Sequence, residues 1–324
     1  MAFSGQLWYI TEGGDAETRL VRINDDGTGS TIVNDNGGAG TGDDDFISSF
    51  NTDIGVDTAA GFYFAIANAP SPQNTVAYLV RGRIDGSVTP TIVVDFVDTI
   101  IVNTIEVDAI NRKIYVGVQD DTGLNGAITG IKVYTYDAST GAVTDTGFLT
   151  TANTDNRPDA AGNKVLDPFD FALDQAAGRL FYSDSVDGLT SGLWRLDLAS
   201  PNVHTQMTTA AQFPVDLSNG QIMDVEIDET TALVYFTTRS RSPSPNVNFD
   251  ANDNALWYIS ESASNATATK VTLTGLPGGH VFYGGDMAFD QSTRQVYLES
   301  SESSPGAADN VIYVFQLDGA GTAL

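Results

Sequence analysis

Short runs of alternating apolar and polar residues recur along the whole chain, and each ends at an aspartate followed by a tight turn. The clearest stretch, residues 170–197, reads DFALDQAAGRLFYSDSVDGLTSGLWRLD. Phe171 and Leu173 alternate with polar positions and predict a first strand that ends at Asp174. A turn over residues 174–178 leads to a second strand over 180–183, and a Gly-containing loop leads to a third over 193–198.

The same pattern returns at four other places in the chain. The aspartates that end the first strands are Asp57, Asp108, Asp174, Asp228 and Asp290, which lie 51, 66, 54 and 62 residues apart. A small sheet repeated at such a period buries its faces only when neighbouring sheets pack on both sides of it, which is typical of a β-propeller. The sequence therefore predicts an all-β, six-bladed β-propeller of four-stranded antiparallel blades.

We expect residues 1–324 to form a single propeller domain. The six predicted blades are residues 5–48, 49–98, 99–164, 165–216, 217–279 and 280–324. The first block matches only the second, third and fourth strands of the repeat. Its first strand is expected from residues 1–6 or from a segment outside this sequence. We therefore interpret the chain as a domain taken from a longer exported protein.

Composition narrows the classes of partner. The chain has 42 acidic and 15 basic residues, a net charge of −27 and no cysteine. Nucleic acid is excluded as a partner because phosphate binding needs clustered Lys and Arg. Membrane insertion is not expected because no run approaches about 18 apolar residues. The first residues, MAFSGQLWYI, do not form a signal peptide. We expect an extracellular or cell-surface location in a bacterium, and a monomer.

The repeated turn aspartates are interpreted as structural. An Asp at the head of a tight turn accepts hydrogen bonds from backbone amides two and three residues later. Its recurrence in five blocks is explained by turn geometry alone. Trp8, Trp194 and Trp257 fall on strand positions and predict packing between blades.

A second set of acidic residues lies four positions before each turn aspartate. These positions hold Asp53, Thr104, Asp170, Asp224 and Asp286. The strand starts of a propeller lie at the mouth of its central channel. Carboxylates gathered there require protons or a cation, and Ca²⁺ accepts six to eight oxygen ligands in flexible geometry. Two interpretations stay open. The aspartates accept hydrogen bonds from amides of neighbouring blades, or Asp53, Asp170, Asp224 and Asp286 bind Ca²⁺.

Residues 167–198 carry the closest family resemblance. The run FALDQAAGRLFYSD followed by LWRLDL resembles the YWTD repeat of six-bladed receptor propellers, with residues 181–184 in the place of the name-giving tetrapeptide. The chain is also similar, more loosely, to NHL-type and gluconolactonase-like propellers. The resemblance implies a six-bladed ring, an architecture that serves both binding and catalysis.

Two functions follow as alternatives. The first is a non-enzymatic, adhesin-like binding or scaffold module of a secreted or surface protein, with a protein or carbohydrate ligand on the acidic channel face and Ca²⁺ as a candidate ligand. The second, implied by the gluconolactonase-like resemblance, is a metal-dependent lactonase or esterase with its site at the channel mouth.

Overall fold

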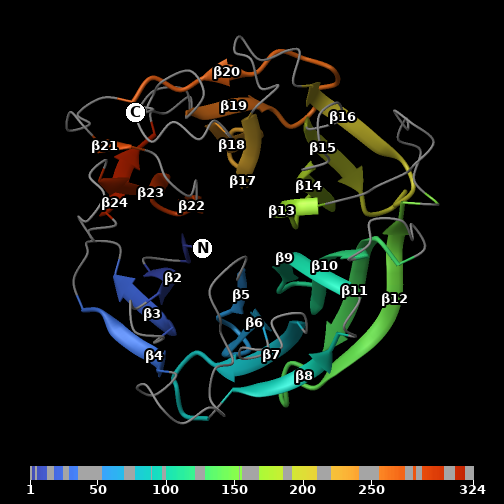
Figure 1. Cartoon of the computed structure of the whole chain (residues 1–324), viewed down its shortest axis with the longest axis vertical. Coiled ribbons are helices and arrows are strands. Elements are labelled where there is room, and N and C mark those ends of the chain that lie inside the picture. Colours follow the sequence, from blue (N-terminus) through green and yellow to red (C-terminus); the bar gives the residue numbers. More distant parts are fainter. Residues whose placement is uncertain are drawn as a thin grey trace. The chain divides into compact units, whose positions relative to one another are not determined.

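The structure is a computed structural model of the whole chain, and part of the chain is described (Figure 1). The described residues are 2–3, 6–12, 18–24, 29–35, 53–68, 77–88, 90–96, 100–120, 128–152, 154, 168–184, 192–209, 220–240, 255–273, 280–281, 287–302 and 311–317. The chain divides into two compact units, Met1–Pro168 and Phe169–Leu324. All regular elements of the described residues are β-strands, as the sequence predicts.

The N-terminal unit holds three four-stranded antiparallel sheets in the orders β1-β2-β3-β4, β5-β6-β7-β8 and β9-β10-β11-β12. Their strands are β1 (Ala2–Phe3), β2 (Gln6–Glu12), β3 (Thr18–Asn24), β4 (Thr31–Asp35), β5 (Ile54–Asp57), β6 (Phe62–Asn68), β7 (Ala77–Arg83), β8 (Thr91–Asp95), β9 (Ile100–Asp108), β10 (Lys113–Asp120), β11 (Gly130–Tyr136) and β12 (Val143–Thr151). Ala2 pairs with Leu7, so residues 1–6 do supply a short first strand to the first blade.

The C-terminal unit holds two further four-stranded sheets, β13-β14-β15-β16 and β17-β18-β19-β20, and the sheet that contains β23. Its strands are β13 (Pro168–Asp174), β14 (Arg179–Asp184), β15 (Gly192–Asp197), β16 (His204–Thr209), β17 (Gly220–Asp228), β18 (Leu233–Ser240), β19 (Leu256–Ser260), β20 (Thr269–Lys270), β21 (His280–Val281), β22 (Met287–Asp290), β23 (Gln295–Glu302) and β24 (Val311–Gln316). The fold is therefore that of an all-β propeller built of four-stranded antiparallel blades.

The prediction of six four-stranded blades is wrong for the last block. β22 pairs with the first residues of β23, and β21 pairs with its last two residues. β24 pairs with the side of β23 opposite to β22. This sheet is three strands wide within the described residues, so the structure has five complete blades. The repeat count assumed one separate strand for each quarter of the block, whereas here two short strands, β21 and β22, share β23 as their partner. Residues 318–324 lie outside the described residues.

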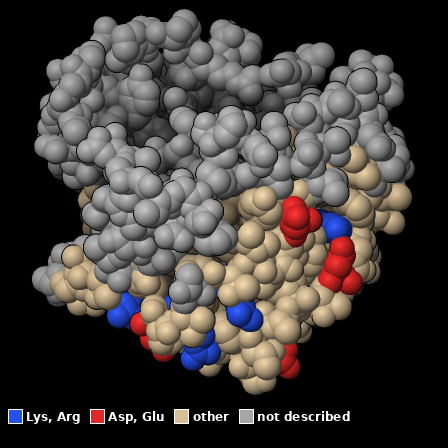
Figure 2. All heavy atoms as spheres, turned by 60° about the horizontal axis from the view of Figure 1, so that its bottom comes forward, with Lys and Arg blue, Asp and Glu red and all other residues tan. Residues whose placement is uncertain are grey.

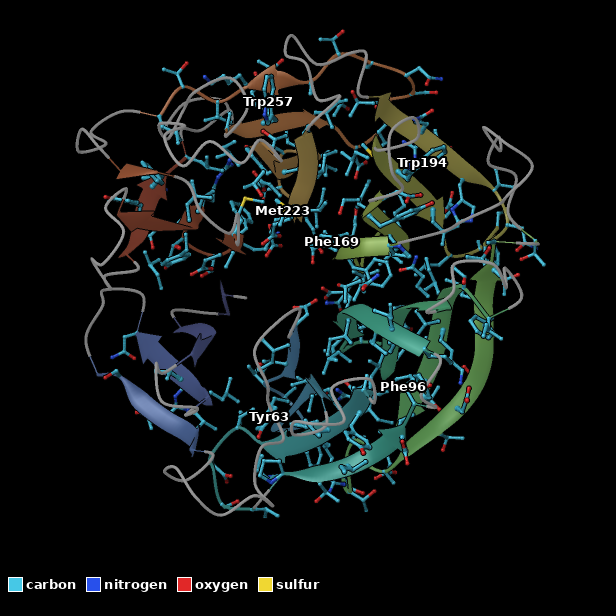
Figure 3. All side chains as sticks on the ribbon, viewed as in Figure 1. Tyr63, Phe96, Phe169, Trp194, Met223 and Trp257 are labelled. Atoms are coloured by element: carbon cyan, nitrogen blue, oxygen red, sulfur yellow. The ribbon has the colours of Figure 1, made fainter. Side chains whose placement is uncertain are left out.

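The blades of each unit pack face to face through apolar clusters. In the N-terminal unit, Phe62, Phe64 and Ile66 of β6 pack with Ile105 and Val107 of β9 in one buried cluster. The rings of Phe64 and Tyr136 lie 4.8 Å apart. Figure 3 labels Phe96, which belongs to this cluster, and Tyr63 of β6, which belongs to a separate buried cluster. The alternating positions of the first strands are thus core residues, as predicted.

The C-terminal unit is organised in the same way. Ala172 of β13 and Phe181 of β14 share a buried cluster with Val225 and Ile227 of β17. Trp194 and Trp257 are buried in their sheets, as predicted for blade packing (Figure 3). The side chain of Trp8 lies outside the described residues.

The turn between first and second strands has one conformation in five blades. Its fifth residue, counted from the aspartate, is left-handed, with φ of 75° at Gly61, 57° at Arg112, 66° at Gly178, 57° at Ala232 and 60° at Arg294. Glycine adopts this conformation without strain, whereas an L side chain is disfavoured there. Three blades therefore hold a non-glycine residue where the backbone alone favours glycine.

No helix among the described residues is long and apolar enough to cross a membrane.

Candidate functional site

The acidic residues at the starts of the first strands are the predicted site. Asp53 directly precedes β5, Asp170 lies in β13 and Asp224 lies in β17. All three are half-buried. Asp286, the fourth predicted metal ligand, lies outside the described residues.

Asp53 links two blades of the N-terminal unit. Its Oδ2 accepts hydrogen bonds from the Thr104 hydroxyl at 2.8 Å and from the Ile105 backbone amide at 3.1 Å. Its Oδ1 accepts one from the amide of Ile54 at 2.7 Å. Burial raises the pKa of Asp53, since it disfavours the charged form, and these hydrogen bonds oppose the rise only in part. Asp53 is therefore a carboxylate held against its neighbour blade by two donors, and the amide of Ile54 in its own blade supplies a third hydrogen bond.

Asp170 and Asp224 repeat this link in the C-terminal unit. Asp170 Oδ2 accepts a hydrogen bond from the amide of Val225 at 2.7 Å, and Asp224 Oδ2 accepts one from Met287 at 2.5 Å. In each case the donor is the residue that follows the equivalent position of the next blade. The alternative in which these aspartates accept amide hydrogen bonds from neighbouring blades is thus observed for all three described members.

The calcium interpretation remains a prediction. Among the described residues, no three His, Cys, Asp or Glu side chains come together in a group able to hold a metal ion. Asp286, the fourth predicted ligand, falls outside those residues.

The turn aspartates act as predicted. Asp57, Asp108 and Asp174 each accept a hydrogen bond from the amide three residues later, at 2.9, 2.9 and 2.8 Å. Asp228 and Asp290 accept bonds from amides two and three residues later. All five side chains are buried. They therefore stabilise the turn that ends each first strand.

Two of these carboxylates also bind an arginine of the next blade, which sequence reasoning missed. Arg112 Nη1 forms an ion pair with Asp57 Oδ2, and Tyr136 Oη donates to the same oxygen at 2.7 Å. Arg294 Nη2 forms the equivalent ion pair with Asp228 Oδ2 at 2.8 Å. Both arginines occupy the left-handed fifth position of their turn. The signal was present in the sequence as an arginine four residues after a turn aspartate.

The junction between the blades of β13 and β17 lacks this arginine. The fifth position of its second turn is Ala232. Asp174 forms no ion pair within the described residues, and its charge adds to burial in raising the pKa of Glu229. Arg179 instead pairs with Glu261 at 2.7 Å, and Arg195 Nη1 donates to the Glu261 carbonyl. This junction is thus held by a different ion pair.

A pocket of about 390 Å³ lies in the N-terminal unit, and sequence reasoning missed it as well. It is lined by Phe62, Arg81, Gly82, Arg83, Ser87, Val88, Ser139 and Thr140. These residues come from the ends of β6 and β7, the turn after β7 and the turn after β11. No charge run marks it in the sequence, because its two parts lie more than fifty residues apart in the chain.

Comparison with known proteins shows the fold. No protein-family model matches the chain, and no curated protein matches its sequence. The crystal structure of TolB from Acinetobacter baumannii matches with a TM-score of 0.57 and 12% identity, over 99% of this chain and 62% of that one. The chain thus spans less than two thirds of this TolB chain.

Two further structures are similar. A protein assigned as TolB from Agrobacterium tumefaciens matches with a TM-score of 0.53 and 11% identity, over 90% of this chain and 82% of that one. A chain of a nidogen/laminin complex matches with a TM-score of 0.49 and 12% identity, over 80% and 72% of the two chains. The TolB matches agree with the β-propeller fold, and at such identities they show the fold alone.

Proposed function

We propose that this chain is a non-enzymatic binding or scaffold module of a secreted or cell-surface bacterial protein. Its ligand is a protein or a carbohydrate, and the module acts as a monomer. Ca²⁺, bound by Asp53, Asp170, Asp224 and Asp286, is a candidate ligand that stabilises the module.

One observation carries this proposal. The described carboxylates at the first-strand starts, Asp53, Asp170 and Asp224, accept hydrogen bonds from backbone amides of the next blade. A hydrolase would need a carboxylate poised beside an open metal position to polarise its substrate and move a proton. Carboxylates that join blades serve architecture, and a scaffold of joined blades that positions loops suits binding.

A hydrolysis assay separates this function from the alternative lactonase or esterase. The chain is incubated with p-nitrophenyl acetate and with a δ-lactone, in CaCl₂ and in EDTA. We expect the rate in buffer alone under both conditions. Turnover that requires Ca²⁺ and is lost in Asp224→Asn would contradict the proposal and favour the hydrolase.

A binding assay tests directly whether the chain binds a protein or a carbohydrate. The labelled chain is applied to a glycan array and to immobilised extracellular-matrix proteins. Saturable retention on either surface by the folded chain, without change to the ligand, supports a binding module. Absence of retention on both surfaces would count against it.

A further inference from the structure

The pocket in the N-terminal unit joins two adjacent blades at their turns. Phe62 begins β6, Arg81 and Arg83 end β7, and Ser139 and Thr140 belong to the turn between β11 and β12. Its volume of about 390 Å³ falls in the range of small-molecule sites. Figure 2 brings forward the side on which Figure 1 draws β7 and β8, and there basic side chains lie among acidic ones.

Two arginines supply the positive charge of the pocket. Arg83 pairs with Phe62 across the strands and Arg81 pairs with Phe64, so both arginines project from the same face of the sheet as the phenylalanines. Their guanidinium carbons lie 4.8 Å and 5.7 Å from the centre of the Phe62 ring. The aromatic ring therefore holds both cations near each other.

Both guanidinium groups keep donors for a ligand. Arg81 Nη1 donates to the Thr140 carbonyl at 2.6 Å, and Arg83 Nη1 donates to the Ala60 carbonyl at 3.5 Å. Neither arginine forms an ion pair with a carboxylate of the described residues. A guanidinium has five N–H donors in a fork that matches a carboxylate. Asp85 and Asp137, the carboxylates beside the pocket, are hydrogen-bonded by Ser87, Ser139 and Thr140, so free guanidinium donors remain for an anionic ligand.

The hydroxyl groups of the pocket offer acceptors. Ser139 and Thr140 both donate to Asp137 Oδ1, at 2.6 and 2.9 Å, and Ser87 donates to Asp85 Oδ1 at 2.6 Å. Their hydrogens are engaged, and the Thr140 oxygen also accepts a hydrogen bond from the Ala142 amide at 3.2 Å, but each hydroxyl oxygen keeps at least one lone pair. A matching ligand must therefore bring its own hydrogen-bond donors beside its anionic group.

The remaining wall is apolar. Val88 lines the pocket with 53% of its surface exposed, and Phe62 is the other apolar side chain in the lining. A bare phosphate or acetate would leave this wall and the hydroxyl acceptors without contacts. The C–H face of a sugar ring covers such a wall while its hydroxyls donate to acceptors.

We propose that this pocket binds a carboxylated sugar of the hexuronic-acid class. The carboxylate binds Arg81 and Arg83, the ring hydroxyls donate to the oxygens of Ser87, Ser139 and Thr140, and one face of the ring packs on Val88. The site lies at the turns of the N-terminal unit and does not depend on the function proposed above.

The test measures binding of D-glucuronate to the whole chain by isotope-edited NMR, with D-glucose and acetate as probes of the separate groups. We expect saturable binding of glucuronate and at least tenfold weaker binding of glucose and of acetate. Equal binding of glucose would overturn recognition of the carboxylate. Equal binding of acetate would overturn recognition of the sugar.

Variants locate the site. Arg83→Gln is expected to weaken glucuronate binding at least tenfold, and Arg83→Lys by less, because lysine keeps the charge without the fork. Lys113→Gln removes the same charge from β10, outside the lining, and is expected to leave binding unchanged. Equal weakening in Lys113→Gln would overturn the site, since it would show that only net charge matters.

Ser139→Ala provides a second test that leaves both arginines in place. It is expected to reduce binding of glucuronate while binding of acetate stays the same. Circular dichroism and the melting temperature confirm that each variant is folded. A folded wild-type chain that binds no glucuronate would overturn the proposal.

Discussion

Two blade junctions share the strand-start link and differ at the fifth residue of the turn. At the junction of the blades of β5 and β9, Asp57 binds Arg112 of the next turn, whereas at the junction of the blades of β13 and β17 the next turn has Ala232 in that position. The strand-start link is present at both, as Asp53 to Ile105 and as Asp170 to Val225. The strand-start link is therefore the constant part of the repeat, and the arginine link is an addition.

The largest expected effect compares the two turn aspartates. Asp57→Ala removes an amide acceptor and the partner of Arg112 and Tyr136, whereas Asp174→Ala removes only the amide acceptor among the described contacts. We expect losses in the free energy of unfolding of about 3 kcal/mol for Asp57→Ala and about 1 kcal/mol for Asp174→Ala. Urea denaturation measures both, and equal losses would show that the arginine link contributes nothing.

The effect of added Ca²⁺ on the melting temperature distinguishes carboxylates that only join blades from carboxylates that also bind a metal ion. If Asp53, Asp170, Asp224 and Asp286 bind Ca²⁺, a concentration of 100 times the dissociation constant adds about 2.7 kcal/mol. The melting temperature should then rise by a few degrees at constant ionic strength, and less with Mg²⁺, which requires a tighter octahedral shell. No rise beyond that of NaCl would remove the metal proposal and leave the blade links.

A smaller effect is expected when an arginine is introduced at position 232, in the junction between the blades of β13 and β17. Ala232 has the same φ of 57° as Arg112, so Ala232→Arg places a guanidinium in the position that Arg112 and Arg294 occupy in their turns. We expect a gain of about 0.5 kcal/mol, since partly exposed ion pairs contribute little. The gain should vanish when Asp174→Asn is added. A gain that persists in the double variant would contradict pairing with Asp174.

The smallest effect is the pH dependence of Asp53. Because burial raises its pKa above the unfolded value near 3.8, the folded state holds the proton more tightly than the unfolded chain. This contribution favours the fold at low pH and is lost as pH rises from about 3.8 through the raised pKa. As the pH rises through this range, the free energy of unfolding should therefore fall less for Asp53→Asn than for the wild type. Parallel stability curves for the two chains would contradict the assignment.

The sequence predicted the parts of the molecule that depend on local periodicity. The strand alternation around Phe171 and Leu173 and the turn at Asp174 follow from short-range patterning, and the structure confirms them. Residues 181–184, which carry the YWTD resemblance, lie in β14 and are buried. The prediction of a complete sixth blade was wrong because a repeat count assigns four separate strands to every block, whereas β21 and β22 of the last block both pair with β23.

Contacts between blades were harder to predict. The link from Asp53 to Ile105 and the pair of Asp57 with Arg112 join residues more than fifty positions apart, and only the spatial register of two blades brings them together. The sequence predicts the first link only as one of two alternatives for the acidic residues at the strand starts, and it does not predict the second. The pocket around Arg81 and Thr140 is a product of the same register.

The most direct test of blade joining is the stability of Asp224→Asn and Asp224→Ala, measured in EDTA. Asparagine keeps an oxygen that accepts the hydrogen bond from the Met287 amide, whereas alanine leaves that amide without this acceptor. We predict a loss of about 2 kcal/mol for Asp224→Ala and less than about 1 kcal/mol for Asp224→Asn. Equal losses for the two variants would show that Asp224 does not act as the acceptor that joins its blade to the next.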